Sequence, residues 1–132
     1  MPRVGVTTLA NVDLDIRQGA DCSWALIYSE RETSDGPTKP NTFAGWLARA
    51  QIRQAIGGVV WHSMASPATI TLTAAANKLT VAGVIGHAVT ETADWNSRSL
   101  GVWDVELVRA DGSVIPLAAG RVLIQHDVTR NA

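Results

Sequence analysis

The stretch Val12-Asp13-Leu14-Asp15-Ile16, residues 12–16, alternates apolar and acidic side chains without a break. Side chains of a β-strand point alternately to its two faces, so this period of two predicts a half-buried strand with both aspartates in solvent. The same pattern returns at 103–107, Trp-Asp-Val-Glu-Leu, with Asp104 and Glu106 facing out. An amphipathic helix needs apolar residues three and four positions apart, so both stretches favour an all-β fold.

Outward from residues 12–16, the chain is a series of short strands separated by turns. The stretch 42–56 also carries alanines and arginines that suit a helix, but strict alternation from Arg49 to Arg53 favours a strand. Asp111-Gly112 predicts a hairpin, and Pro116 marks an edge or a bulge. Helical character is confined to 90–95. The further strands are expected at 22–29, 42–56, 59–64, 68–73, 78–84, 100–107, 114–117 and 120–126.

These strands fit a single domain. A chain of 132 residues has the length of one domain. About seven to nine short strands with regularly spaced turns predict a sandwich of antiparallel strands with at most one short helix, and a barrel is the alternative. The segments 1–11 and 127–132 are expected to be extended tails. The loop Glu30 to Asn41, rich in turn formers and charges, is a candidate docking arm, with Arg31 and Lys39 as predicted contacts.

Charge and tryptophan content point to a protein that works in contact with neighbours. Charged residues make up 17% of the chain, against about 25% in an average soluble domain. The net charge of -1 lacks the basic excess of a nucleic-acid binder, so no nucleic-acid partner is expected. Five tryptophans stand against one Phe and one Tyr, and Trp is common at interfaces.

Strand alternation separates the tryptophans into two groups. Trp24, Trp46 and Trp103 lie in register with inward-facing residues and are expected in the core. Trp95, between Asp94 and Asn96, is the clearest candidate for an exposed contact residue, and Trp61 is undecided between core and surface.

Membrane, disulfide and catalytic signals are missing from the sequence. We expect no signal peptide and no membrane span, since no apolar run approaches the roughly 18 residues required. Cys22 is the one cysteine, so an internal disulfide is excluded, and it is expected in the core. The three histidines, His62, His87 and His126, lack a second ligand at metal spacing.

Neither the acidic pairs nor the serines of the sequence indicate a metal site or a catalytic site any more strongly. Asp13 with Asp15 could hold calcium, but the solvated face of a strand explains the pair better. Ser63 has no Gly-x-Ser-x-Gly context. We therefore expect no enzyme, no metal and no cofactor.

Several segments, in order, resemble a family of tailed-phage proteins. Residues 14–21 are similar to an I-x-Q-G-D opening, except that Ala20 separates its glycine and aspartate. Residues 43–53 resemble the stretch that follows in the family. The remaining similar segments are 68–73, 103–107 with 111–112, 120–122 and 127–130. The family comprises the N-terminal domains of siphophage upper baseplate proteins and minor tail proteins of phages infecting actinobacteria.

This resemblance implies an immunoglobulin-like sandwich that docks other modules onto a tail tip or baseplate. It implies a non-enzymatic virion protein, made in the host cytoplasm and located in the tail, whose partners are other tail or baseplate proteins and further copies of itself. No fibre domain follows Arg130, so a stand-alone adaptor is expected. The alternatives are a capsid decoration or head–tail connector protein, or a carbohydrate-binding module for host recognition. The candidate interaction residues are Trp95, Trp61, Arg31 and Lys39.

Overall fold

The computed structural model describes residues 10–31 and 36–126, which form nine strands and two short helices. Tails at 1–9 and 127–132, and residues 32–35 of the polar loop, lie outside the described residues. The elements are β1 (Ala10–Asn11), β2 (Leu14–Arg17), β3 (Cys22–Tyr28), β4 (Leu47–Arg53), β5 (Val60–Ala65), β6 (Ile70–Ala75), β7 (Lys78–Ile85), α1 (His87–Thr90), the 3₁₀ helix η1 (Ala93–Ser97), β8 (Leu100–Val108) and β9 (Val114–Gln125).

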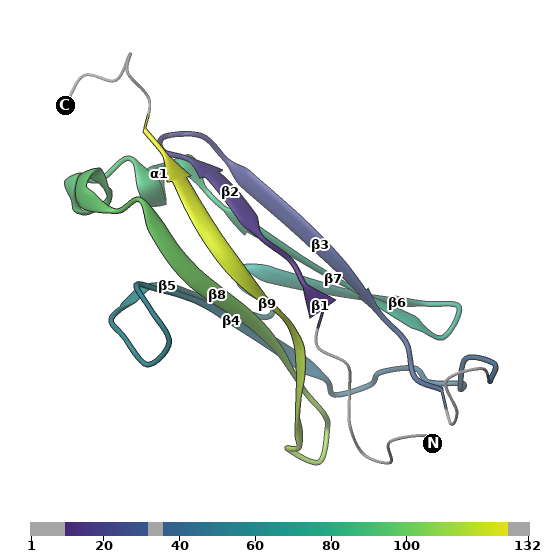
Figure 1. Ribbon diagram of the computed structural model, residues 1–132. Coiled ribbons are helices and arrows are strands. Elements are labelled where there is room, and N and C mark those ends of the chain that lie inside the picture. The colour runs from purple at the N-terminus through teal and green to yellow at the C-terminus, as the bar shows by residue number, and fades with distance from the viewer. Residues whose placement is uncertain (1–9, 32–35, 127–132) are drawn as a thin grey trace.

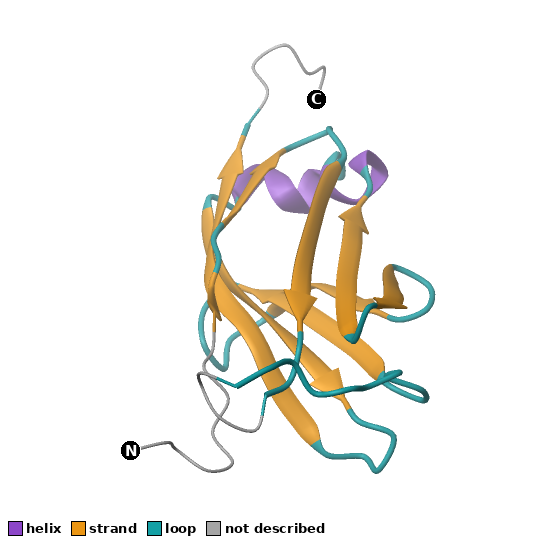
Figure 2. Cartoon of the chain, turned by 90° about the vertical axis from the view of Figure 1, so that its right-hand side faces the viewer, coloured by secondary structure: helices purple, strands orange, loops and turns teal. Residues whose placement is uncertain are grey.

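The strands form two sheets that face each other (Figures 1 and 2). The larger sheet, which we call sheet A, has the order β1-β9-β8-β4-β5, with β2 also paired to β9. The smaller, sheet B, has the order β3-β7-β6. Both helices lie at one end of the sandwich, which we call the helix end. The long loop after β3 and the β8–β9 hairpin lie at the opposite, loop end.

This strand order is that of an immunoglobulin-like sandwich. Immunoglobulin strands B, E and D form one sheet, and G, F and C form the other, with C′ added in variable-type domains. Here β3-β7-β6 corresponds to B-E-D and β9-β8-β4-β5 to G-F-C-C′. The predicted all-β, immunoglobulin-like fold is therefore confirmed.

Alternation explains why these segments became these strands. In β4 the buried residues Ala48, Ala50 and Ile52 alternate with more exposed ones, and β8 repeats the pattern. Between the sheets, Trp24 of β3 packs edge-on against Trp103 of β8, with ring centroids 5.2 Å apart. In antibody domains a disulfide joins the corresponding strands B and F. Here two indoles fill that place.

Several details differ from the sequence expectations. The strand expected at 42–56 is confined to β4, 47–53. Ala10 and Asn11 belong to a strand rather than to the tail, and both β1 and β2 pair with β9 in parallel. The strands expected at 114–117 and 120–126 are one strand, β9, because a bulge in β9 at Leu117, next to Pro116, accommodates the proline without ending the strand. The helical stretch extends over two helices, α1 and η1.

Candidate functional site

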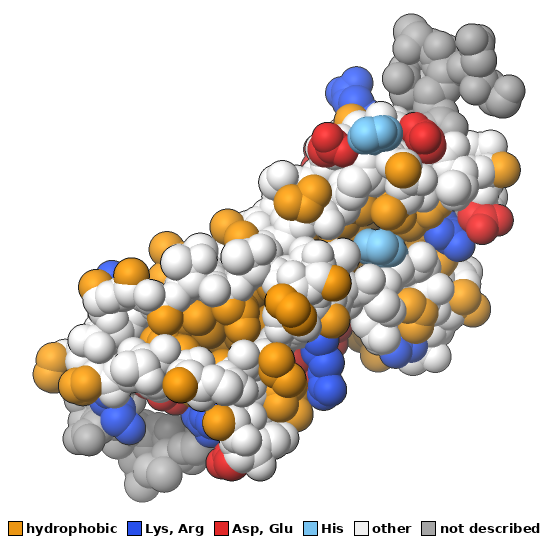
Figure 3. All heavy atoms as spheres, turned by 180° about the vertical axis from the view of Figure 1, so that it is seen from behind, with side chains coloured by type: hydrophobic (Ala, Val, Ile, Leu, Met, Phe, Trp, Pro, Cys, Tyr) orange, Lys and Arg blue, Asp and Glu red, His pale blue; other side chains and the backbone are white. Residues whose placement is uncertain are grey.

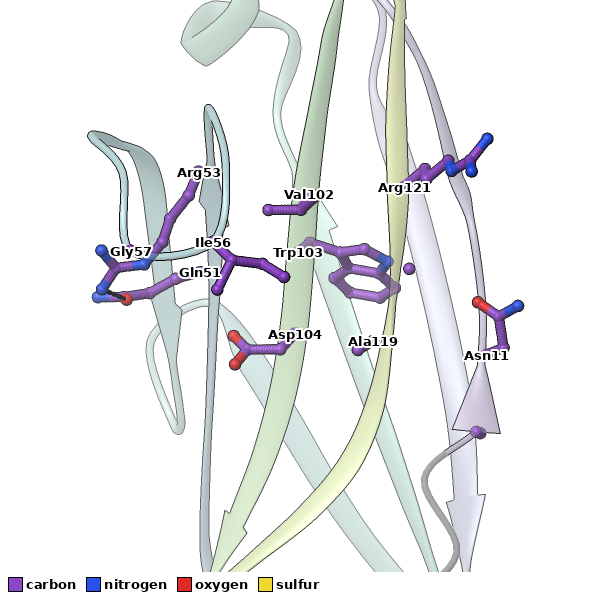
Figure 4. Close-up of a pocket in the computed structure, with 12 residues that line it drawn as sticks. Asn11, Gln51, Arg53, Ile56, Gly57, Val102, Trp103, Asp104, Ala119 and Arg121 are labelled. Atoms are coloured by element: carbon purple, nitrogen blue, oxygen red, sulfur yellow. Dashed lines mark hydrogen bonds between the residues drawn. The ribbon is translucent and has the colours of Figure 1, made fainter.

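A groove of about 610 Å³ opens on the outer face of sheet A (Figure 4). Four strands and the β4–β5 turn contribute to it. Val102 and Ala119 supply apolar surface, and Ile56 of the turn adds a side chain that is 93% exposed. The remaining lining residues are Ala10, Asn11, Gln51, Arg53, Gly57, Trp103, Asp104, Gly120 and Arg121. The exposed isoleucine and the apolar floor together give the groove an apolar surface that is open to solvent.

Local sequence explains the hollow. Ala119 lies directly opposite Asp104 in the β8–β9 ladder, and the next β9 residue on the same face, Arg121, has a much larger side chain. Gly120 stays free of a side chain because the carbonyl oxygen of Val12 would lie 1.9 Å from an added Cβ. The small Ala119 therefore keeps the floor low between taller side chains, whereas Gly120, one residue further on, faces Val12 on the other side of the strand.

Charged groups surround the apolar floor. Arg53 donates from Nη1 to the carbonyl oxygen of Gly58 at 2.9 Å and from Nη2 to Oε1 of Gln51 at 2.6 Å. Both acceptors are neutral, and Asp104 is the carboxylate of the groove that interacts with the Arg53 charge. Partial burial, with a contribution from Glu106, raises the pKa of Asp104. The groove can therefore hold an aliphatic group next to charged or polar groups of a partner.

The described residues also form two further hollows. One of about 520 Å³ continues along β4, β5 and β8 and shares Gln51, Arg53 and Asp104 with the groove. Another, of about 320 Å³, lies between β4, β6 and the β5–β6 connection, with Trp46 and Pro67 in its wall. Seen from behind, the molecule shows hydrophobic side chains gathered in hollows that are bordered by backbone and other side chains (Figure 3).

The predicted residues Arg31 and Lys39 are exposed at the loop end. The backbone N–H of Lys39 donates to the carbonyl oxygen of Glu30 at 2.7 Å, and Arg31 forms an isolated bridge with Thr38. These bonds close the loop on itself, and no side-chain partner is found for either cation among the described residues. Both lie far along the sandwich from the helix end, so the structure does not bring them together with Trp61 and Trp95.

A compact polar network anchors this loop. Glu30 accepts hydrogen bonds from Arg109 at 2.9 Å, Asn41 at 2.8 Å and Tyr28 at 3.2 Å. Although burial alone would raise the pKa of Glu30, these bonds outweigh it and lower that pKa. Arg109 also lies over the ring of Trp46, 5.7 Å from its centroid. The network ties the loop to the β8–β9 hairpin.

The prediction that Trp95 is exposed is wrong. Its side chain is only 2% exposed, because η1 folds back over the helix end and carries the indole into the core. Trp61 is half-buried, with its ring centroid 6.0 Å from that of Trp95. Arg98 lies over both rings, at 5.2 Å from Trp61 and 4.7 Å from Trp95. This cluster closes the end of the sandwich and offers no exposed indole.

None of the five tryptophans is exposed. Trp24, Trp95 and Trp103 are buried, and Trp46 and Trp61 pack partly against the core. Within the described residues, no three His, Cys, Asp or Glu side chains cluster closely enough to hold a metal ion. No helix of that part is both long and apolar enough to cross a bilayer.

No protein-family model and no curated protein matches the sequence. Among solved structures, the chain is similar to the crystal structure of the ZIG-8-RIG-5 IG1-IG1 heterodimer, monoclinic form. The identity is 10% and the TM-score 0.32, over 92% of this chain and 90% of that one. At this TM-score the likeness carries no argument about function.

The groove was not among the sites predicted from the sequence. Alternation predicted that Asp104 faces outward and that Arg49 and Arg53 belong to a strand. No local pattern indicates that β4, β8 and β9 lie side by side around Ala119. The exposed Ile56, next to the Gly57-Gly58 turn, was the one signal available.

Proposed function

We propose that this chain is a non-enzymatic structural subunit of a tailed-phage virion. It acts as an adaptor at the tail tip or baseplate and docks another tail protein in the groove of sheet A. The observation that carries the proposal is the groove itself, an apolar floor beside the exposed Ile56. The virion context comes from the resemblance of the sequence segments to phage tail and baseplate domains.

The groove favours an occupant with an aliphatic side chain next to an acidic one. Val102, Ala119 and Ile56 offer apolar surface for the first. Arg53 and Arg121 offer positive charge for the second, against the single carboxylate of Asp104 in the lining. Burying an aliphatic side chain contributes about 1.5–3 kcal/mol, while the charges select the partner and its orientation.

The alternatives have less support. A glycan-binding site on exposed tryptophan loses its basis, since every indole is buried or half-buried. A capsid decoration or head–tail connector role uses the same kind of docking surface and differs only in its place in the virion.

Labelling of virions tests the location. A gold-labelled antibody against this chain should bind the tail tip or baseplate of intact particles. Label on the head would replace the tail assignment with decoration, label at the neck would point to a connector, and unlabelled particles would reject a virion role.

A substitution in the groove tests the docking surface. Ala119→Arg fills the floor, and its long side chain can still reach solvent, so the fold should be retained. In a phage that depends on a plasmid copy of the gene, we expect at least a hundredfold loss of infectious titre. The matched control is Val84→Arg, on the outer face of sheet B, where Val84 is 51% exposed. Equal titres for the two variants would reject the groove as the docking surface.

A further inference from the structure

Strand β3 lies at the edge of sheet B. Among the residues that the structure describes, it pairs with β7 and with no other strand. Natural proteins usually protect such an edge with a charge, a proline, a bulge or a very short strand. The seven residues of β3, Cys22–Tyr28, contain no charged residue, no proline and no glycine, and their ladder with β7 is regular. This edge can therefore accept another strand.

The hydrogen-bond pattern shows which backbone groups face that edge. The N–H of Val84 donates to the carbonyl oxygen of Thr69, on the β6 side of β7. Backbone groups of successive residues point to opposite sides, so Gly83 bonds toward β3, where it lies opposite Trp24. Trp24 therefore bonds β7, and its neighbours face away from β7. The residues that turn their N–H and C=O to the free edge are Ser23, Ala25 and Ile27.

Side chains beside the edge are incompletely covered. Cys22 and Leu26 point to the core side of sheet B together with Trp24, yet both are only half-buried. On the outer side of the same strand, Ile27 is 69% exposed. An additional strand would bury apolar surface on both faces as well as satisfy the free backbone groups.

The segment that precedes Ala10 in the same copy begins level with the C-terminal end of β3, which is the wrong position for pairing along this edge. Cys22 Sγ lies 4.0 Å from the carbonyl oxygen of Asp15, so β2 and β3 are level at that point. The turn after β2 reverses the chain, so five residues before Asp15 correspond to five residues after Cys22. Ala10 is thus level with Ile27. Residues that precede Ala10 would have to reverse direction to lie beside Ser23 and Ala25 of the same copy.

We propose that residues 3–9 of a second copy add to the free edge of β3. This stretch, Arg-Val-Gly-Val-Thr-Thr-Leu, alternates Val4, Val6 and Thr8 with Gly5, Thr7 and Leu9 and is rich in residues that favour strands. Added strands gain affinity from main-chain hydrogen bonds and specificity from alternate side chains. The valines are suited to cover Cys22 and Leu26. The inference rests on the proposed role as an assembly subunit and names one of its contacts.

The contact is head to tail. Each copy donates residues 3–9, which precede β1 at the edge of sheet A. It accepts the same segment of another copy along the free edge of β3. Such a heterologous contact builds a ring if the rotation closes and a filament if it does not. A ring of copies around a tail axis would be one product of this geometry.

Two proline substitutions distinguish the donor segment, residues 3–9, from the acceptor strand, β3. Ala25→Pro removes a free-edge N–H that β7 does not use, so the fold should survive while the acceptor is blocked. Val6→Pro leaves the acceptor intact and disables the donor. The matched control is Ala74→Pro in β6, at the opposite edge of sheet B, where the same alternation turns the N–H of an exposed alanine to solvent.

Sedimentation velocity reads out the result, with circular dichroism to verify that each variant is folded. We expect the wild type and Ala74→Pro to assemble as concentration rises, and Ala25→Pro and Val6→Pro each to remain at 14.0 kDa. Mixing the two single-defect variants should restore a one-to-one dimer, since one supplies a donor and the other an acceptor.

Three outcomes would overturn the inference. They are a wild type that stays monomeric at all concentrations, oligomers that persist in both single-defect variants, and a mixture that forms no dimer. Ala25 and Ala74 are not among the residues that line the groove of sheet A. A defect in strand addition therefore leaves the titre result for Ala119→Arg as an independent test of the proposed function.

Discussion

The indole of Trp103 donates a hydrogen bond from Nε1 to the backbone carbonyl oxygen of Val12, at 2.7 Å. The bond joins β8 to the connection between β1 and β2, across Gly120 of β9. Asp13 supports the same connection by accepting a hydrogen bond from the backbone N–H of Arg121 at 2.9 Å. Trp103 and Arg121, which line the groove, therefore also hold the connection between β1 and β2 against sheet A.

Gly120→Ala should destabilise the fold, because the new Cβ would lie 1.9 Å from the carbonyl oxygen of Val12 and force the backbone apart. Overpacking of this kind costs about 1–3 kcal/mol, measurable by urea unfolding. Gly86→Ala is the control, since an added Cβ there meets nothing within 4 Å. Equal midpoints for the two variants would contradict the close approach of Val12 and Gly120.

Glu30→Gln should loosen the loop end. The change removes the negative charge that accepts from Arg109 while keeping the size of the side chain, and we expect a loss of about 1–2 kcal/mol after discount for partial exposure. The pKa of Glu30 is lowered in the fold, so its contribution is complete above the ordinary carboxyl pKa and is lost as pH falls through the folded value.

The measurement for Glu30 is the pH dependence of the unfolding free energy. Wild type and Glu30→Gln should differ at pH 7 and converge in acid. Arg49→Gln is the matched control, because Arg49 pairs with Glu106 at 2.9 Å in an exposed bridge, which contributes little. A constant difference between wild type and Glu30→Gln down to low pH would reject the ionised network.

The fold was predictable where a strand is half-buried, and the site was not. Alternation at 12–16 and 103–107 identified β2 and β8, since burial on one face imposes a period of two on the sequence. The burial of Trp95 was missed because it depends on how η1 folds over the helix end, which no local pattern records. The groove was missed for the same reason, since Arg53, Asp104 and Arg121 come from three strands.

Trp95→Ala should act on stability. Removing a buried Trp leaves a cavity and costs about 3–5 kcal/mol, and Arg98 loses one of its two aromatic partners. Trp61→Ala should cost less, because Trp61 is only half-buried. Thermal unfolding of both variants provides the comparison. An unchanged melting temperature for Trp95→Ala would mean that the indole lies outside the core.

His87 and Asp21 form an exposed pair at the helix end. Asp21 Oδ1 accepts from the backbone N–H of His87 at 2.7 Å and lies 2.9 Å from its Nδ1. The hydrogen bond to the Asp21 carboxylate raises the pKa of His87, and the backbone and side-chain bonds from His87 lower the pKa of Asp21. We expect Asp21→Asn to return the pKa of His87 toward its ordinary value.

The sign of the pH effect follows from both shifts. The contribution of His87 is complete below its unfolded pKa and is lost as pH rises through its raised folded value, while that of Asp21 is lost as pH falls through its lowered one. The pair is therefore most stabilising at roughly pH 4–6.5, between the two ordinary values. NMR titration of the histidines measures the raised pKa of His87 directly. His62, whose pKa is lowered by burial, should not respond to Asp21→Asn. High salt should weaken the His87 shift, since both side chains are exposed and screened. An unchanged His87 titration in Asp21→Asn would show that the pair does not form in solution.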